Sequence, residues 1–317
     1  MPADRIPSRI AELIGQLAPK AKQPVSATVL NKWIAQAEGK VGPEAKGGRL
    51  GWLVASSVAI AAIQRAVDVD GRQLFLLKGG AWLQHRLNAT SRTTKDVDGL
   101  VRGDLDVFLK ALETVLAEPW GPLTLRRGPV EVINVPTKIL KPRRFDVIME
   151  LRGVTWRRIK VEVSPDEAGI GDSFEAVEPT PLDRFGLPDP DVLVGIAMRF
   201  QIAQKLHAAS DPHDPPVSVN DRARDVPDLL LSRDLADFAG TPTLAEIKGA
   251  GMAVFESRAA EAAQLGFPAR EWPPVLAAYP HWEDDYRRAA ESAGITLTLQ
   301  DAVAEANAWI AEINAVE

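Results

Sequence analysis

The order of strand and helix signals between residues 70 and 165 constrains the fold of this chain more than any other feature. The segment predicts, in order, strand 73–77, helix 81–87, a strand around 96–98, helix 104–116, and strands at 123–125, 130–135, 145–151 and 154–163. Arg152-Gly153, between the last two strands, is typical of a hairpin turn. Because the later strands follow one another without helices between them, the pattern predicts an α+β fold rather than a regular βαβ array.

Helical patterns precede and follow this segment. Residues 51–67 are apolar on most sides, which predicts a helix buried against a sheet. Further helices are predicted over 192–208, over 222–231 and through the tail from residue 244. We therefore expect an N-terminal helical region (1–68), a mixed core (69–240) and a C-terminal helical region (241–317).

Composition limits the chemistry and the location of the chain. There is no cysteine, so disulfides, cysteine-ligated zinc and thiol nucleophiles are excluded. The longest apolar stretch without a charge has 13 residues, whereas a membrane-spanning helix needs about 20. The first 17 residues lack the uninterrupted apolar region of a secretory signal. We expect a soluble, cytoplasmic protein without a membrane partner.

Asp96 and Asp98 are candidate metal ligands. On a strand, side chains two residues apart share a face and lie about 7 Å apart, so both carboxylates point outward while Val97 packs inward. Mg²⁺ prefers carboxylate oxygens together with the phosphates of a substrate. The pair indicates nucleotidyl or phosphoryl transfer, although Asp-x-Asp pairs also occur at strand ends that bind nothing.

Gly79 and Gly80 lie where a predicted strand meets a predicted helix. Residues without a Cβ let phosphate oxygens approach the backbone, and the N–H groups at a helix N-terminus bind anions. The alternative is an ordinary turn.

Lys205 lies in a helix that is otherwise rich in apolar residues, and Asp225 begins the next predicted helix. Lys205 is a candidate ligand for a triphosphate, and Asp225 is a candidate to orient it or to act as a base. The alternatives are a lysine whose head reaches solvent from a helix edge and a surface ion pair of Asp225 with Arg222 or Arg224.

Four motifs occur in the order that is typical of one known family. They are L-L-K-G-G-A-W-L, S-R-T-T-K-D-V-D, Q-I-A-Q-K-L-H-A and R-A-R-D-V-P-D-L, spread over residues 76–229. The chain resembles the AbiEii/AbiGii-type nucleotidyltransferase toxins, the MenT-like group found in toxin–antitoxin and phage-defence pairs. It departs from them in having Gly-Gly rather than Gly-Ser, and in the fifteen residues between that turn and the aspartates.

The resemblance implies roles for particular residues in a nucleotidyltransferase-like core. Asp96 and Asp98 correspond to the metal-binding pair, and a third carboxylate would be Glu162 or, as the second choice, Asp146. An ion pair is the alternative for either one. The expected nucleotide-binding residues are Lys78, Gly79, Gly80, Arg92, Thr94 and Lys205, with Asp225 joining Lys205 in the catalytic set.

The resemblance also implies an activity. It indicates a Mg²⁺-dependent enzyme that transfers a nucleoside monophosphate from an NTP to the 3′ end of tRNA, which blocks translation, with a cognate antitoxin as partner. The alternatives are transfer to a protein or small molecule, a kinase-like reaction, or a binding module without turnover.

The charge of the chain is unevenly distributed. The net charge is −6, yet residues 122–160 carry ten basic and three acidic residues. A basic, strand-rich segment beside the expected site is typical of a groove for an RNA backbone. A solvated basic face is the alternative.

Overall fold

A computed structural model describes residues 13–42, 45, 47–87 and 94–316. Within them, eight strands form one mixed sheet in the order β3-β5-β6-β2-β1-β8-β7, and β4 pairs with β5. The strands are β1 (Phe75–Lys78), β2 (Asp96–Val101), β3 (Leu123–Arg127), β4 (Glu131–Val132), β5 (Arg143–Leu151), β6 (Val154–Pro165), β7 (Phe174–Val177) and β8 (Leu193–Ile196). With the helices on both sides, this confirms the predicted α+β class.

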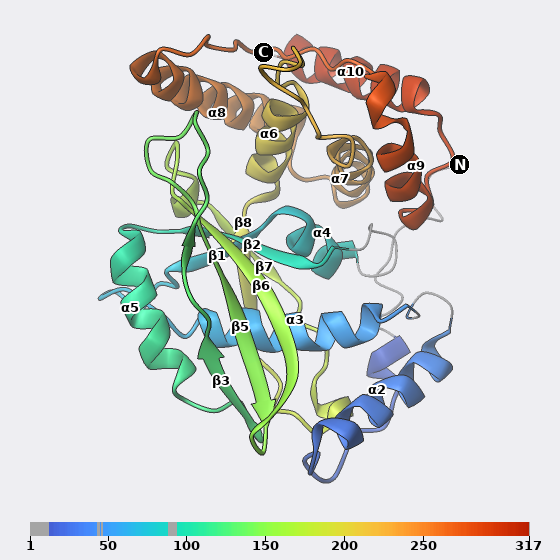
Figure 1. The fold of residues 1–317 in the computed structure, drawn as a ribbon. Helices are drawn as coiled ribbons and strands as arrows, with labels where there is room; N and C mark the ends of the chain where they lie inside the picture. The colour runs from blue at the N-terminus through green and yellow to red at the C-terminus, as the bar shows by residue number, and fades with distance from the viewer. Residues whose placement is uncertain (1–12, 43–44, 46, 88–93, 317) are drawn as a thin grey trace.

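Helices cover the two faces of the sheet unequally. The described helices are α2 (Ala27–Val41), α3 (Arg49–Ile63), α4 (Gly79–Leu87), α5 (Leu105–Leu116), α6 (Met198–Ala209), α7 (Asp225–Ala239), α8 (Leu244–Leu265), α9 (Glu283–Ser292) and α10 (Leu299–Ala315). In Figure 1, α3 lies behind β5 and β6, while α6 to α10 form a layer at the top of the view. None of the described helices lies in front of β5 and β6 in this view.

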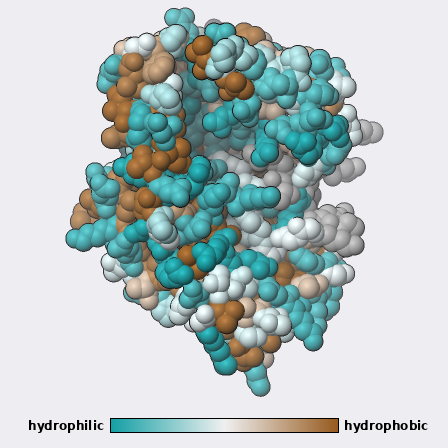
Figure 2. Space-filling model, in the orientation of Figure 1, coloured by the Kyte–Doolittle hydropathy of each residue, from teal (hydrophilic) through white to brown (hydrophobic). Residues whose placement is uncertain are grey.

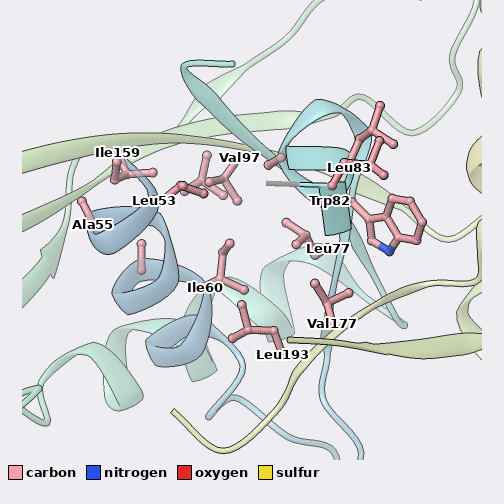
Figure 3. Close-up of a cluster of buried hydrophobic side chains, with 14 of the residues drawn as sticks. Leu53, Ala55, Ile60, Leu77, Trp82, Leu83, Val97, Ile159, Val177 and Leu193 are labelled. Atoms are coloured by element: carbon pink, nitrogen blue, oxygen red, sulfur yellow. The ribbon is translucent and has the colours of Figure 1, made fainter. Parts of the chain in front are cut away.

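The face behind the sheet contains the larger core. Almost every residue of α3 is buried, as its apolar sequence predicts. Figure 3 shows Leu53 and Ile60 of this helix beside Val97 and Leu77 of the strands. Burying side chains of this size stabilises the fold by about 1.5–3 kcal/mol each, so this helix fixes the back of the sheet and leaves the front available for polar groups.

A smaller core covers the front of the sheet at the other end. Leu76 and Leu100 are buried there against Phe200 of α6 and Val254 of α8. Because Leu100 follows Asp98 by two residues on the same strand, apolar packing ends where the carboxylates begin.

The β5–β6 hairpin follows from the alternation of its side chains. Phe145, Val147, Met149 and Leu151 are buried, whereas Arg144, Asp146 and Glu150 are partly exposed, with Ile148 as the buried exception. At the turn, Arg152 has φ 54° and Gly153 has φ 78°, which is the conformation that two-residue hairpins favour. The predicted turn is confirmed.

The predicted helix over 192–208 is wrong in its first part. Residues Leu193–Ile196 form β8, and α6 begins only at Met198. All four residues of β8 are buried, and a short run buried on both faces has no periodicity that separates strand from helix. Strand β7, which pairs with β8, was also missed, because Phe174–Val177 is too short to give a clear pattern.

Candidate functional site

Asp96 and Asp98 lie on β2 and point toward the open front of the sheet. Both are half-buried, and Val97 between them is fully buried. The alternation that the sequence predicts is therefore present. Figure 2 views the same face and shows hydrophilic residues across much of the surface in front of the sheet.

Strand pairing places Asp98 in a row of charged residues. Its register partners are Lys78 on β1 and Glu162 on β6. Glu162 in turn lies opposite Arg144 on β5, whose Nε donates to Glu162 Oε1 at 2.7 Å. Residues in register on adjacent strands point to the same side of the sheet. This row, which we call the Asp98 row, brings two carboxylates together between a lysine and an arginine.

A second row runs through Asp96. Its register partner on β6 is Lys160, whose Nζ lies 3.9 Å from Asp96 Oδ1. Asp146 on β5 is the next residue in that row, so Lys160 stands between the two aspartates. Of the two candidates for a third carboxylate, Glu162 is therefore the neighbour of the pair, although it already accepts from Arg144.

The Gly79 turn brings the start of α4 against Asp98. Gly79 has φ 67°, and a Cβ on it would clash with Asp98 Oδ2. The missing side chain thus makes room for a carboxylate of the site itself. The Gly79 N–H is also occupied, since it donates to Gln201 Oε1 at 2.9 Å.

The polar groups around Asp98 shift one another's pKa. Burial raises the pKa of Asp98, Lys78 and Lys205 oppose that rise, and Glu162 and Asp96 add to it. Burial lowers the pKa of Lys78, and Glu167 and Asp98 oppose that change. The Lys78 Nζ donates to Ser164 Oγ at 2.7 Å. Perturbed groups of opposite charge packed together are typical of catalytic sites.

Lys205 is held between two carboxylates. Its Nζ donates to Asp225 Oδ1 at 2.8 Å and to Asp228 Oδ2 at 2.6 Å. Its side chain is only 9% exposed and that of Asp228 is fully buried. Lys205 therefore does not reach out to solvent, and Asp225 pairs with it rather than with Arg222 or Arg224. Asp228 was missed, although its position three residues after Asp225 on a helix places both on one face.

Thr94 lies just before β2, where its N–H donates to Gln84 Oε1 at 3.1 Å. Its hydroxyl lies 3.4 Å from the carbonyl oxygen of Asp96. Arg92, the remaining residue expected to bind nucleotide, lies outside the described residues. Gln84, Gln201 and Ser164 contact expected site residues and were not singled out, because neutral polar residues in apolar segments give no charge or spacing signal.

Glu167, after β6, joins three elements beside the site. It accepts hydrogen bonds from Lys138 on the β4–β5 connection, from Gln204 on α6 and from Arg258 on α8. Arg258 and Lys138 hold the pKa of Glu167 far below its usual range despite its burial. Glu167 thus fixes α6, which carries Lys205, relative to the sheet that carries Asp98.

The basic segment contributes to the same open face. Arg158 and Lys160 are exposed on β6, and Arg126 on β3 is 55% exposed beside Glu150. Arg126 and Arg158 both lie opposite Ile148 of β5. Basic side chains therefore line the front of the sheet next to the aspartates.

The donor set suits a cation shared with a substrate better than one enclosed by the protein. Within the described ranges, no group of three or more His, Asp or Glu converges closely enough to hold a metal ion. Asp96 and Asp98 supply two carboxylates on one face of β2, and Mg²⁺ is usually bound by one or two carboxylates plus phosphate oxygens and water. The residues present fit a magnesium ion on those terms. As for membranes, no described helix has the length and apolar character to span a bilayer.

Comparisons with known proteins identify the family and the fold of the chain. A family model for the nucleotidyl transferase AbiEii toxin of type IV toxin–antitoxin systems matches residues 61–308. Among solved structures, the chain is similar to MenT4, a nucleotidyltransferase toxin from Mycobacterium tuberculosis H37Rv, with a TM-score of 0.50 and 16% identity over 92% of this chain and 99% of that one. At this identity the similarity concerns the fold. No curated protein matches the chain.

Proposed function

Since the chain belongs to the AbiEii family of nucleotidyltransferase toxins, we propose that it transfers a nucleoside monophosphate from an NTP to the 3′ end of tRNA. The Asp98 row carries this proposal. The row pairs the carboxylates of Asp98 and Glu162 beside Lys78, and the Gly79 turn at the start of α4 packs against Asp98. Positioning and charge stabilisation are what transfer at a phosphate requires.

Asp96 and Asp98 are the proposed ligands of Mg²⁺, with Glu162 as the third carboxylate if Arg144 releases it. A magnesium ion bound there would neutralise phosphate charge and polarise the α-phosphate. The low dielectric that raises the pKa of Asp98 also strengthens its attraction for a cation.

The other residues of the site bind and orient the NTP in this proposal. Lys78, Gly80 and Lys205 supply positive charge and a backbone donor for the triphosphate, and Arg92 and Thr94 are further candidate ligands. Asp225 orients Lys205, which its 2.8 Å hydrogen bond supports. An acceptor hydroxyl attacks the α-phosphorus in line and releases its proton to solvent. Its oxygen forms a bond to phosphorus as the bond to the β-phosphate oxygen breaks, and pyrophosphate leaves.

A single-stranded RNA end is the proposed acceptor. Its unpaired nucleotides can enter a pocket, whereas a helix cannot, and Arg126, Arg158 and Lys160 can bind the backbone that follows. Modification of the 3′ end would prevent aminoacylation and stop translation. We propose that the protein acts in the cytoplasm and that a cognate antitoxin neutralises it.

The test is an acceptor screen. The purified protein is incubated with Mg²⁺, total tRNA and each NTP labelled at the α-phosphate, and the products are separated by mass. We expect label on tRNA. Label on the protein itself would show that the acceptor is a protein and not tRNA. If no label is transferred, and Asp96→Ala and Lys205→Ala retain the toxicity of the wild type in cells, the enzymatic function is refuted.

A further inference from the structure

Gln201 lies on the face of α6 that meets the site. It precedes Lys205 by four residues on the same helix, and residues so spaced share a helix face. It is 3% exposed, so its polar side chain is almost completely removed from water. A buried amide needs partners for its oxygen and for its nitrogen, so its two ends are considered separately.

The oxygen end of Gln201 holds the Gly79 turn. Gln201 Oε1 accepts from the Gly79 N–H at 2.9 Å, and the Asp98 carboxylate occupies the space where a Cβ of that glycine would lie. Gly79 is thus clamped between α6 and β2. The amide cannot be reversed, because Nε2 would then face the Gly79 N–H donor with a donor of its own.

The nitrogen end of Gln201 has no hydrogen-bond partner. Nε2 is buried and donates no hydrogen bond within the part of the chain that the structure describes. Leaving a buried donor unsatisfied is unfavourable, because the group has lost its hydrogen bonds to water. Because Nε2 and Oε1 are bonded to the same carbon and Oε1 contacts Gly79, this unused donor lies beside the Gly79 turn.

We propose that Gln201 is a nucleotide-binding residue whose Nε2 donates to an oxygen of the NTP triphosphate while Oε1 positions the Gly79 turn. The proposal rests on the function proposed above. A phosphate oxygen is the acceptor that fits, because it is an anion beside Lys78 and at the start of α4, where oxyanions are favoured.

The experiment compares the affinity of the whole protein for NTP and for the matching NMP in Mg²⁺, measured by calorimetry. In Gln201→Met, which keeps the length and removes both polar atoms, we expect the preference for NTP over NMP to fall roughly 10- to 100-fold. In Gln201→Glu, which keeps an acceptor for Gly79, we expect KM for NTP to rise while kcat falls less than in Gln201→Met.

The matched control is Gln64→Met. Gln64 is also a buried amide in contact with the sheet, but both its ends are bonded, to Phe75 and to Val194. We expect this variant to lose stability and to keep the NTP preference. An unchanged preference in Gln201→Met, with the same loss of Tm as in Gln64→Met, would overturn the proposal.

The outcomes separate the two proposals. If the wild type binds NTP but labels no RNA, the proposed RNA acceptor is wrong. The affinities of the Gln201 variants then still show whether Gln201 binds the triphosphate. If the wild type binds no NTP at all, both proposals fail.

Discussion

Gly79 and Asp98 fit together only because one of them lacks a side chain. A Cβ at position 79 would meet both Oδ2 and Cβ of Asp98, so the carboxylate would have to leave its position in the Asp98 row. Any substitution at Gly79 is therefore unfavourable for two reasons. The first is the positive φ, which strains the backbone of any L residue with a side chain. The second is the displacement of Asp98, a proposed metal ligand.

These two costs are separated by a matched pair of variants. Gly71 also has a positive φ, 78°, but has open space where a Cβ would lie. We expect Gly71→Ala and Gly79→Ala each to lose about 1 kcal/mol of stability from backbone strain, measured by urea unfolding. We expect only Gly79→Ala to lose transfer activity, by roughly 10-fold or more, because a displaced catalytic group costs that much. Equal activity in both variants would contradict this reading.

Lys205 between Asp225 and Asp228 raises the question of whether it serves stability or catalysis. Removing one partner of a buried ion pair leaves uncompensated charge and costs about 3–5 kcal/mol. We expect Lys205→Met to unfold at correspondingly lower urea concentration. The triple variant Lys205→Met, Asp225→Asn, Asp228→Asn removes the charges as well, so we expect it to regain much of that stability.

Activity of the same variants decides the role of the lysine. If Lys205 acts on the nucleotide, the triple variant remains inactive although it is folded. Recovery of transfer together with stability would show that Lys205 only holds α7 against α6.

For single residues, the sequence reveals the charged members of the candidate site but not the neutral polar ones. Asp96, Asp98, Lys205 and Asp225 stood out by spacing and resemblance, and the structure brings all four to one region. Gln201 did not stand out, because its role depends on an approach to Gly79 from 122 residues away in the chain. Local sequence pattern contains no information on such a contact.

Among the elements, α6 and α8 are joined by an unusual polar contact. His207 on α6 accepts from Arg258 on α8 and lies against Arg270 after it. Glu167 and Lys138 complete the surroundings of the ring, which also packs edge-on against Phe255. Burial and the two arginines lower the pKa of His207 to about 2, so the ring stays neutral in the folded protein.

This contact predicts a pH dependence of stability. The unfolded state takes up a proton at His207 near pH 6.5 and the folded state does not, so stability is complete above that pH and is lost as the pH falls. At pH 5 the loss from His207 is about 2 kcal/mol. His85, whose burial lowers its pKa to about 4, changes stability in the same direction.

The measurement is urea unfolding of wild type and His207→Gln at pH 7.5 and pH 5. We expect the difference between the two pH values to be smaller in the variant by about 2 kcal/mol. Groups common to both proteins cancel, including Asp98 and Asp211, whose raised pKa values act in the opposite direction. If the stability of both proteins fell equally between pH 7.5 and pH 5, His207 would not be a source of the pH dependence.

Elements that show periodicity were predictable, and short buried ones were not. The β5–β6 hairpin and α3 follow from alternation and from an apolar run, and both are found where the sequence predicts them. Strands β7 and β8 have four residues each. They form because β7 pairs with β8 and β8 pairs with β1. That pairing is a tertiary interaction, so the sequence of either strand alone cannot reveal it.

For the whole molecule, the distribution of charge is more informative than the net charge of −6. The exposed basic residues of β3 and β6 lie on the open face, whereas residues 276–317 contain eight acidic and two basic residues. This asymmetry predicts that RNA binds over the sheet and avoids the C-terminal helices.

Salt dependence tests the location of the RNA. Each lost phosphate contact lowers the slope of log affinity against log salt by about 0.7 for a single strand. We expect that reduction for Arg158→Ala on β6, measured by filter binding with labelled tRNA. The control is Arg288→Ala on α9, where we expect no change of slope. Equal slopes for both variants would place the RNA elsewhere.

The central claim is that Asp98 and its neighbours form the active centre of an enzyme that extends RNA 3′ ends. The most direct measurement is transfer of α-labelled NTP to tRNA whose 3′ end is either intact or blocked by periodate oxidation. We expect the wild type and the exposed-residue control Asp106→Asn to label only intact tRNA, and Asp98→Asn to be slower by roughly 100-fold or more. Equal labelling of blocked tRNA, or full activity of Asp98→Asn, would contradict the claim.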